Sequence, residues 1–371
     1  MGEDESSILV MKLLHIVGAR PNFMKAAPVI HVLDHESSVH QMLIHTGQHY
    51  DANMSEVFFR ELDIPEPDLN LEVGSGTHGR QTAQIMMRFE EVVLENRPDL
   101  VLVYGDVNST AATAMVCAKL WIPVGHVEAG LRSFDRSMPE EINRVITDQI
   151  ADVLFTPSRD GDTNLLAEGV SQDKIHFVGN VMIDTLIHLL PKAETHWETD
   201  QIREWRERKY ILVTIHRPSN VDEPAVLTEI MKTLGAISER LPVLFPVHPR
   251  TAKALKRMGY TKKNSNFHLM DPIGYLDFLA LQQNATAVIT DSGGIQEETT
   301  YLGVPCLTVR KNTERPVTLT TGTNILVGQD MEKLRIEMDR ILSGESKKGA
   351  LPPLWDGHAS ARIAQIIASY T

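Results

Sequence analysis

The sequence predicts an α/β protein made of two doubly wound domains, each with a parallel sheet covered by helices on both faces. Short apolar runs rich in Val, Ile and Leu alternate with helical patterns along the chain. Strands buried on both sides read as continuous apolar runs, and parallel strands need crossover connections between them. The chain has 371 residues, which corresponds to two domains of roughly 150 residues each.

The first series of strands begins near the N-terminus. Helical stretches, for example 82–95 and 109–119, fall between these strands and provide the crossovers that a parallel sheet requires. The expected strands of the first domain are Leu13–Val17, Gln41–His45, Leu100–Tyr104, Val124–Val127, Val153–Thr156 and Ile175–Val178.

A second series of strands begins near Tyr210. The stretch 180–200 is polar and less periodic, so we expect the boundary there, with one domain over 11–181 and the other over 182–355. The expected strands of the second domain are Ile211–Thr214, Val243–Pro246, Phe267–Leu269, Ala287–Thr290 and Cys306–Val309.

Composition excludes several classes of partner. Lys and Arg total 36 against 49 Asp and Glu, a net charge of −13, whereas a nucleic-acid surface needs clustered basic side chains. No apolar run approaches the length of a membrane span. Cys117 and Cys306 lie in apolar surroundings typical of reduced thiols, and residues 1–7 are acidic, the wrong charge for a signal peptide. We therefore expect a cytoplasmic protein with neither a nucleic-acid nor a membrane partner.

The segment Asp291–Glu298 predicts an anion site. It follows the apolar run 287–290 and opens a helical pattern with Ser292-Gly293-Gly294. Glycines let a phosphate approach the backbone, and the first N–H groups of a helix point at the bound anion. Glu298 lies far enough along the helix to reach ribose hydroxyls. An ordinary helix N-cap with tight glycine packing is the alternative.

Polar clusters follow the predicted strands in both halves of the chain. In open α/β sheets, ligands bind beyond the carboxyl ends of the strands. Because the clusters accumulate at strand ends, we expect a substrate bound between the two domains. The clusters are Gly18–Lys25, Gly105–Asp106, His126–Arg132, His216–Arg217, His248–Arg250 and Asp291–Gly294.

At these segments the chain resembles the non-hydrolysing UDP-N-acetylglucosamine 2-epimerases. The matches occur in the order that the family has, over roughly residues 12–370. The matching segments are Gly18–Pro21, Tyr104–Asp106, His126–Arg132, Pro139–Arg144, Thr214–Arg217, Asp291–Glu298 and Thr313–Pro316.

The resemblance implies the glycosyltransferase-B fold, in which two Rossmann-like domains face each other across a cleft. It also implies that the C-terminal helix, 356–371, packs back on the first domain, and that the second domain binds UDP. The partners expected by resemblance are a UDP-sugar substrate and a second copy of the chain in a homodimer.

The implied reaction is reversible inversion at C2 of UDP-N-acetylglucosamine, giving UDP-N-acetylmannosamine. The family eliminates UDP across C1–C2 to 2-acetamidoglucal and then adds it back. Three acids match the family's catalytic positions, Asp106, Glu128 and Glu140, and His216 matches its catalytic histidine. Carboxyl groups close together can hold one proton and one charge, which supplies an acid and a base at neutral pH. The sequence leaves open which acid removes the C2 proton.

The remaining candidates bind substrate. Arginine clamps phosphate oxygens in pairs and lysine adds a point charge, whereas a diphosphate fits the glycine cradle. No hydride is transferred, so no cofactor is expected, and the histidines lack the spacing of metal ligands, so no metal is expected. The expected substrate-binding residues are Arg20, Lys25, His248, Ser292, Gly293, Gly294, Glu298 and Arg315.

Several of these residues also have structural interpretations. Asp106 suits the N-cap of the helix that follows it, and Glu140 is typical of a first-turn acid. His216 can satisfy a loop. Arg132 and Arg144 suit structural ion pairs with the acids better than direct catalysis.

The chain departs from many bacterial members at His216–Asn220, at Val317 and over Thr46–Asp51. In those members these regions help hold a second, activating UDP-N-acetylglucosamine, so we expect that this chain does not need it. The departures also leave the sugar open. The alternatives are C2 epimerisation of another UDP-2-acetamido sugar, such as a di-N-acetylated uronic acid, a glycosyltransferase, and a non-catalytic UDP-sugar sensor.

Overall fold

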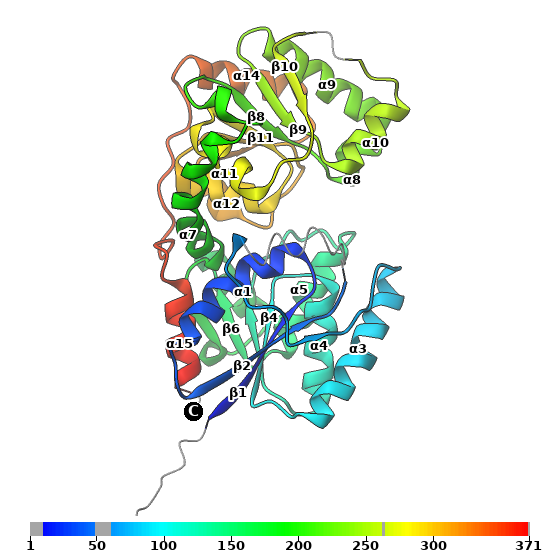
Figure 1. Ribbon diagram of the computed structural model, residues 1–371, viewed down its shortest axis with the longest axis vertical. Helices are drawn as coiled ribbons and strands as arrows, with labels where there is room; N and C mark the ends of the chain where they lie inside the picture. The colour runs from blue at the N-terminus through cyan, green and yellow to red at the C-terminus, as the bar shows by residue number, and fades with distance from the viewer. Residues whose placement is uncertain (1–9, 49–60, 262–263, 370–371) are drawn as a thin grey trace, which may run out of the picture. The chain divides into compact units, whose positions relative to one another are not determined.

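A computed structural model describes residues 10–48, 61–261 and 264–369. The chain divides into two compact units, Met1–Thr185 with Pro353–Thr371, and Leu186–Pro352 (Figure 1). Of the expectations above, those on residues 1–7, on 49–51 and on the last two residues of the C-terminal helix lie outside the described residues. The division into folding domains at 11–181 and 182–355 stays a prediction.

The first unit contains a seven-stranded parallel sheet in the order β3-β2-β1-β4-β5-β6-β7. Strand order therefore reverses between β1 and β4, which pair from Leu13 with Leu100 onward. The strands are β1 (Met11–Val17), β2 (Val39–His45), β3 (Leu69–Asn70), β4 (Leu100–Tyr104), β5 (Val124–Val127), β6 (Val153–Thr156) and β7 (Ile175–Phe177).

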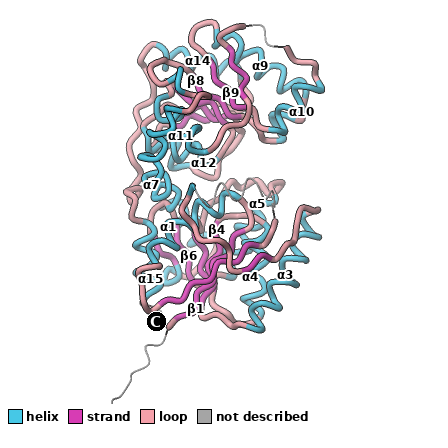
Figure 2. The backbone as a smooth tube through the Cα atoms, in the orientation of Figure 1, coloured by secondary structure: helices cyan, strands magenta, loops and turns pink. Residues whose placement is uncertain are grey.

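Helices cover both faces of this sheet (Figures 1 and 2). The α3, α4 and α5 helices pack on one another on one side, and α1 packs with the C-terminal helix α15 on the other. Asp184 holds α15 by accepting from the backbone N–H groups of Ala359 and Ser360. The helices are α1 (Arg20–Leu33), α3 (His78–Glu95), α4 (Asn108–Lys119), α5 (Pro139–Ile150), α6 (Arg159–Ala167) and α15 (Ala359–Ala368).

The second unit contains a six-stranded parallel sheet in the order β10-β9-β8-β11-β12-β13. Strand order reverses here between β8 and β11, where Thr214 pairs with Thr290. The strands are β8 (Ile211–Thr214), β9 (Val243–Pro246), β10 (Phe267–Met270), β11 (Ala287–Thr290), β12 (Cys306–Thr308) and β13 (Asn324–Leu326).

The second unit has its own apolar core. It is built from β8, β9 and β11 together with the buried faces of α9 and α14. The helices are α7 (Val181–Thr195), which begins in the first unit, α8 (Pro218–Val221), α9 (Pro224–Ser238), α10 (Pro249–Arg257), α11 (Tyr275–Asn284), α12 (Gly293–Leu302), α13 (Pro316–Thr320) and α14 (Met331–Leu342).

The predicted α/β class with two doubly wound parallel sheets is confirmed. The bounds of β4, β5, β6, β8, β9 and β11 agree with the predicted strands. The stretch 180–200, whose polar and less periodic sequence indicated a domain boundary, is mostly the helix α7, which buries Leu186 and Leu189. Among the described residues, no helix combines the length and apolar character of a membrane span.

One buried histidine links three strands of the first sheet. His15 on β1 is fully buried, with Nδ1 2.6 Å from the Tyr104 hydroxyl and Nε2 2.8 Å from the Gln41 side-chain oxygen. Burial lowers the pKa of His15 from 6.5 to about 4, against an opposing effect of the Gln41 hydrogen bond. His15 is therefore neutral in the folded protein.

This neutral histidine predicts a pH dependence of stability. Between pH 6.5 and 4, His15 is protonated in the unfolded chain but stays neutral in the folded protein. The free energy of unfolding therefore falls as the pH is lowered. The full loss is about 3 kcal/mol. Urea unfolding of wild type and His15→Gln across this range measures it, and the variant should lose that part of the slope. The exposed His40→Gln is the control, and equal slopes for all three proteins would contradict the prediction.

Candidate active site

The predicted residues of the first unit gather where strand order reverses. Lys25 lies on α1 after β1, Asp106 follows β4, and Glu128 follows β5. Neighbouring strands β1, β4 and β5 are parallel, so their carboxyl ends share one edge of the sheet. The reversal point is where open α/β sheets leave a crevice for ligands. The sheet topology therefore brings these three side chains together.

Glu128 is held by a buried lysine. The Lys25 Nζ lies 2.6 Å from Glu128 Oε2, and both side chains are almost fully buried. Glu128 has φ +75°, a left-handed conformation that is costly for a residue other than glycine. Gly105, with φ +63°, leaves room beside the pair, since a Cβ there would lie 2.7 Å from Lys25 Nζ. The small residue at Gly105 therefore leaves space for the Lys25–Glu128 ion pair.

Asp106 is held by an arginine of α5. Arg144 Nη2 lies 2.5 Å from Asp106 Oδ2, and the Asn143 amide donates to the Asp106 carbonyl at 2.9 Å. The α4 helix begins after Val107 and has no side-chain N-cap hydrogen bond, so Asp106 does not cap it. The structural pairing expected of Arg144 is therefore found, with Asp106 as its partner.

Glu140 and its neighbour Glu141 have different environments on α5. The Glu141 carboxylate is buried and accepts from Ser133 and the Phe134 backbone, and it pairs with Arg144. Glu140 is half-buried, and within the described residues its carboxyl group has no hydrogen-bond or ion-pair partner. Glu140 precedes Arg144 by one helical turn, which places both on the same face of α5. Glu128 Oε2 lies beside Gly105, the residue before Asp106, and Arg144 joins Asp106 to α5, the helix that carries Glu140.

Arg20 begins α1 and is exposed. The residue that fixes this turn is Asn22, which sequence reasoning missed. Its side-chain oxygen accepts from the Gly18 and Ala19 N–H groups, and its amide donates to the Tyr104 carbonyl at 2.7 Å. Asn22 thus joins the ends of β1 and β4, and its place in the segment Gly18–Lys25 was the available signal.

In the second unit, His216 follows β8 and Asp291 follows β11, on either side of the strand reversal. The His216 Nδ1 lies 3.0 Å from Asp291 Oδ1. Asp291 also accepts from the backbone N–H groups of His216 and Arg217 and from the Asn220 amide. Burial alone would raise the pKa of Asp291, but these hydrogen bonds and the His216 charge lower it. Asp291 therefore orients His216, a role the sequence did not assign.

The predicted anion cradle is a strand-to-helix turn. Ser292 is the N-cap residue of α12 and makes no side-chain cap hydrogen bond, while its backbone N–H donates to Thr290 Oγ1. A Cβ at Gly293 would lie 2.6 Å from Arg315 Nη1 and 2.7 Å from Glu314 Oε1. Arg315 therefore lies directly against the first turn of α12, and a larger residue at position 293 would require the ends of the Arg315 and Glu314 side chains to move.

Buried charges surround the cradle. Arg315 is paired with Glu314 and, at 2.9 Å, with Glu297 Oε1. Glu298 is 3% exposed and accepts from the Tyr275 hydroxyl and from the Gln282 amide. Tyr275 and Gln282 both lie on α11, so Glu298 of α12 is held against that helix.

His248 is the N-cap residue of α10, where its Nδ1 accepts from the Arg250 N–H. Its ring lies 5.2 Å from that of His216, centroid to centroid, at 35°. Burial and then the neighbouring His216 lower the pKa of His248. The structure therefore brings both predicted histidines of this unit together.

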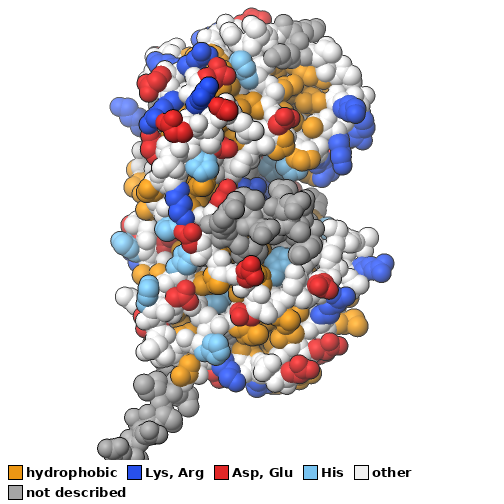
Figure 3. Space-filling view, in the orientation of Figure 1, with side chains coloured by type: hydrophobic (Ala, Val, Ile, Leu, Met, Phe, Trp, Pro, Cys, Tyr) orange, Lys and Arg blue, Asp and Glu red, His pale blue; other side chains and the backbone are white. Residues whose placement is uncertain are grey.

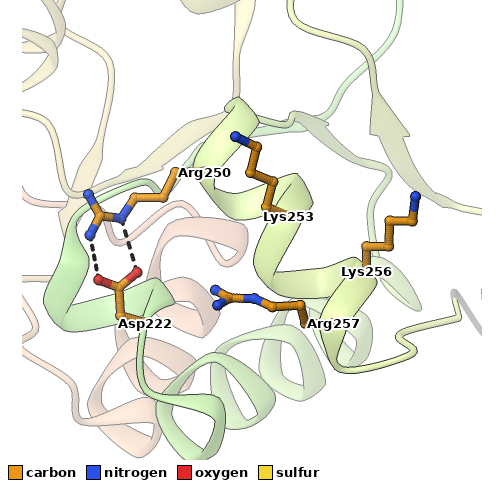
Figure 4. Close-up of a pocket in the computed structure, with 5 residues that line it drawn as sticks. All are labelled: Asp222, Arg250, Lys253, Lys256 and Arg257. Carbon is orange, nitrogen blue, oxygen red and sulfur yellow. Dashed lines mark hydrogen bonds and ion pairs between the residues drawn. The ribbon is translucent and has the colours of Figure 1, made fainter. Parts of the chain in front are cut away.

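A pocket of about 570 Å³ lies elsewhere on the second unit (Figure 4). It is lined by Arg250, Lys253, Lys256 and Arg257 of α10 and by Asp222 at the end of α8. Arg250 is hydrogen-bonded to Asp222, and Figure 3 shows Lys and Arg side chains gathered over α10. The lining includes none of the predicted site residues, and its one carboxylate is already paired. The pocket suits an anion and has no base for proton abstraction, so it is not the candidate active site.

Within the described ranges, no three His, Cys, Asp or Glu side chains form a group that could hold a metal ion. The fold defines the class of protein: a two-domain α/β protein in which each unit has the doubly wound order of nucleotide-binding domains.

Comparison with known proteins gives the family. The family model for UDP-N-acetylglucosamine 2-epimerase matches residues 31–368. A UDP-N-acetylglucosamine 2-epimerase of Methanococcus maripaludis is 44% identical over 359 residues, covering 95% of this chain and 97% of that protein. A UDP-2,3-diacetamido-2,3-dideoxy-D-glucuronate 2-epimerase of Pseudomonas aeruginosa is 42% identical over 361 residues, covering 96% and 99%.

A solved structure agrees with this assignment. The crystal structure of Methanocaldococcus jannaschii UDP-GlcNAc 2-epimerase, in complex with UDP-GlcNAc and UDP, matches with a TM-score of 0.88 and 43% identity. The match covers 97% of this chain and all of that one. The chain belongs to the UDP-N-acetylglucosamine 2-epimerase family and is an enzyme, which confirms the resemblance and the predicted glycosyltransferase-B fold.

Replacing Asp291 tests its anchoring role. Asp291→Asn places an amide donor among N–H groups that need an acceptor, so the free energy of unfolding should fall by on the order of 3 kcal/mol. Urea unfolding measures the change. The matched control is Asp222→Asn, which removes an exposed aspartate whose pKa Arg250 also lowers and should leave stability close to that of wild type. Equal effects at both positions would show that Asp291 is no anchor.

Proposed function

We propose that the enzyme interconverts UDP-N-acetylglucosamine and UDP-N-acetylmannosamine by eliminating UDP to 2-acetamidoglucal and adding it back. The observation that carries the proposal is that Glu128 lies beside the Gly105–Asp106 turn and that Arg144 joins Asp106 to α5, the helix that carries Glu140. Removal of the weakly acidic C2 proton needs a positioned base, and its return needs a donor. Neighbouring carboxyl groups can supply both.

In this proposal the second unit binds the nucleotide part of the UDP-sugar. Backbone N–H groups at Ser292–Gly294 receive the diphosphate, with Arg315 beside them, and Glu298 receives the ribose. His216, oriented by Asp291, stabilises or protonates the departing UDP. Arg20, Lys25 and His248 add positive charge and hydrogen-bond donors for the phosphates.

The relatives support UDP-N-acetylglucosamine as the substrate. The Methanococcus relative is named for it, and the Methanocaldococcus structure contains it. The Pseudomonas relative, at 42% identity, acts on a di-N-acetylated uronic acid instead, so sequence identity alone separates the two sugars weakly. The expectation that no second UDP-N-acetylglucosamine is needed for activation stays a prediction.

Proton NMR in D2O tests the reaction. The purified protein with UDP-N-acetylglucosamine, without added metal or nicotinamide, should place deuterium at C2 while UDP-N-acetylmannosamine appears. Asp106→Asn should slow exchange by about 100-fold or more, because general acid–base groups contribute that much, while UDP binding persists. The control is Asp99→Asn, an exposed aspartate at the other end of β4, which should exchange normally.

Two results would overturn the proposal. Wild-type protein that binds UDP but shows no exchange would point to a modified sugar, tested next with the di-N-acetylated uronic acid, or to a sugar-nucleotide sensor. Equal loss of UDP binding and exchange in Asp106→Asn would remove Asp106 from the catalytic set.

We further propose a homodimer formed through α3. Its outer face exposes Met87 and Leu94, 67% and 64% exposed, seven residues apart on one stripe. Trp121, at the end of the neighbouring helix α4, is 88% exposed and has φ +55°. A bulky residue in the left-handed region costs about 1 kcal/mol or more, and exposed aromatic rings are typical anchors of interfaces.

The distribution of charged residues along α3 favours a second copy of the chain as the partner that binds this face. Arg80 lies in its first half, and Glu90, Glu91 and Glu95 lie in its second half. Met87 lies near the middle, so a two-fold axis there would place Arg80 opposite the acidic half of the partner's α3. Such a surface is self-complementary, as an isologous interface requires. In Figure 1, α3 lies at the outer edge of its unit.

Sedimentation velocity tests the dimer. Met87→Glu would place two like charges at the symmetry axis, so we expect the wild-type dimer to become a monomer at micromolar concentration. Leu351→Glu is the control, because Leu351 is a 53% exposed apolar residue of the other unit. A monomeric wild type, or an unchanged Met87→Glu dimer, would contradict this interface.

Two buried thiols support the cytoplasm as the location. Cys117 and Cys306 are free, and burial raises their pKa values to about 12 and about 11. Thiols of this kind are typical of proteins in reducing compartments.

A further inference from the structure

A chain of alternating charges lies behind the acids of the first unit. His126 Nδ1 is 2.6 Å from Asp148 Oδ1, and Asp148 Oδ2 is 2.7 Å from Arg132 Nη1. Arg132 in turn makes two hydrogen bonds to Glu168, at 2.8 and 2.7 Å. His126, Asp148 and Arg132 are buried, and only Glu168 reaches the surface. The pairing of Arg132 with Asp148 and Glu168 differs from the expected pairing with a catalytic acid.

Hydrogen-bond geometry sets the charge of His126. Its Nδ1 meets the Asp148 carboxylate, and its Nε2 lies 2.8 Å from the Gly105 carbonyl oxygen. Both partners accept, so both ring nitrogens donate and the ring is an imidazolium. Burial alone would raise the pKa of Asp148, but His126 and Arg132 lower it, which keeps Asp148 ionised. With His126 charged, the chain of four groups is neutral.

His15 shows that burial alone does not decide this charge. It is as fully buried as His126 and also has partners at both nitrogens, but these are the neutral Tyr104 hydroxyl and Gln41 amide. A neutral ring can donate to one such partner and accept from the other. The two histidines of the same sheet therefore differ in charge because their partners differ.

The chain holds both turns that carry catalytic acids. His126 binds the carbonyl of Gly105, the residue before Asp106, and Asp148 accepts from the Gly130 N–H two residues after Glu128. The Gly105 N–H donates to the Val127 carbonyl at 3.0 Å. Glu128 has φ +75°, a strained conformation for a residue other than glycine, so its turn needs outside support to keep this conformation.

We propose that His126, held as an imidazolium by Asp148, is a positioning residue that fixes the spacing of Asp106 and Glu128. The inference rests on the catalytic roles proposed for these two acids. His126 touches neither carboxylate and acts through the backbone of the turn. Loss of its proton would turn a lone pair toward the Gly105 carbonyl and leave Asp148 with one cationic partner fewer, so the turn would shift.

Charged groups lie on both sides of His126. Asp148 faces it from α5, Arg132 and Glu168 lie beyond Asp148, and the Lys25–Glu128 pair lies beyond Gly105. Because His126 acts through the backbone of the turn, its loss should lower kcat while KM for the UDP-sugar stays constant. A misplacement of about 1 Å can cost on the order of 100-fold in rate.

The first test measures the protonation state of His126 without an activity assay. Protein with ¹⁵N-labelled histidine should give, at pH 7.5, two protonated nitrogens for His126 and a neutral ring for His15, with each signal assigned by its disappearance in His126→Gln or His15→Gln. A neutral His126 ring would overturn the proposal. In Asp148→Asn, which removes the carboxylate beside Nδ1, the His126 ring should be neutral at the same pH, and a doubly protonated ring there would also count against the proposal.

The second test measures how His126 affects kcat and KM. His126→Gln should lower kcat by about 100-fold with KM little changed. His15→Gln, the matched buried control, should keep the kcat of wild type. Thermal unfolding of each variant checks that the protein is folded.

Unchanged kcat in folded His126→Gln would overturn the positioning role. If wild type catalyses no exchange on either UDP-sugar, the proposed function fails, while the NMR result for His126 is still obtained. The two failures are therefore distinguishable.

Discussion

Charges that leave water need opposite charges beside them, and this constraint shapes both units of the protein. An unpaired ion in the interior costs several kcal/mol even after the surroundings relax. Lys25 therefore accompanies Glu128, Arg144 accompanies Asp106 and Glu141, and Arg315 lies between Glu297 and Glu314. Each pair fixes a side chain and also joins segments that are distant along the chain.

The order of the strands decides where these charges can act. In each sheet the order reverses once beside the first strand, between β1 and β4 and between β8 and β11. At a reversal the crossover helices leave toward opposite faces, so the backbone at the strand ends stays uncovered. The acids of the first unit and the His216–Asp291 pair of the second both lie at these points. A parallel sheet without the reversal would bury the same residues under helices.

The same side chain serves different purposes according to its partners. His15 meets a hydroxyl and an amide and stays neutral, whereas His126 meets a carboxylate and a carbonyl and carries a proton. Glu140 and Glu141 are neighbours on α5, but Glu141 makes structural hydrogen bonds and an ion pair, whereas Glu140 is proposed as a catalytic acid. The difference arises from the elements packed against each residue.

The sequence by itself determined the fold class and most of the strands, because continuous apolar runs and the turns that end them are local features. Strands β3 and β13, of two and three residues, were not among the predicted strands. The amphipathic character of α7 was missed because the polar residues among its buried leucines masked the helical period.

The proposed catalytic acids came from segments that resemble the family, and the predicted anion cradle from one contiguous segment, so both can be read directly from the sequence. The residues that hold them could not be read in this way. Asp291 and His216 are 75 positions apart, and Asp148 lies 22 positions from His126. Only the tertiary structure decided these partners, since a buried ion pair depends on which strand ends become neighbours, and that depends on the order of the whole sheet.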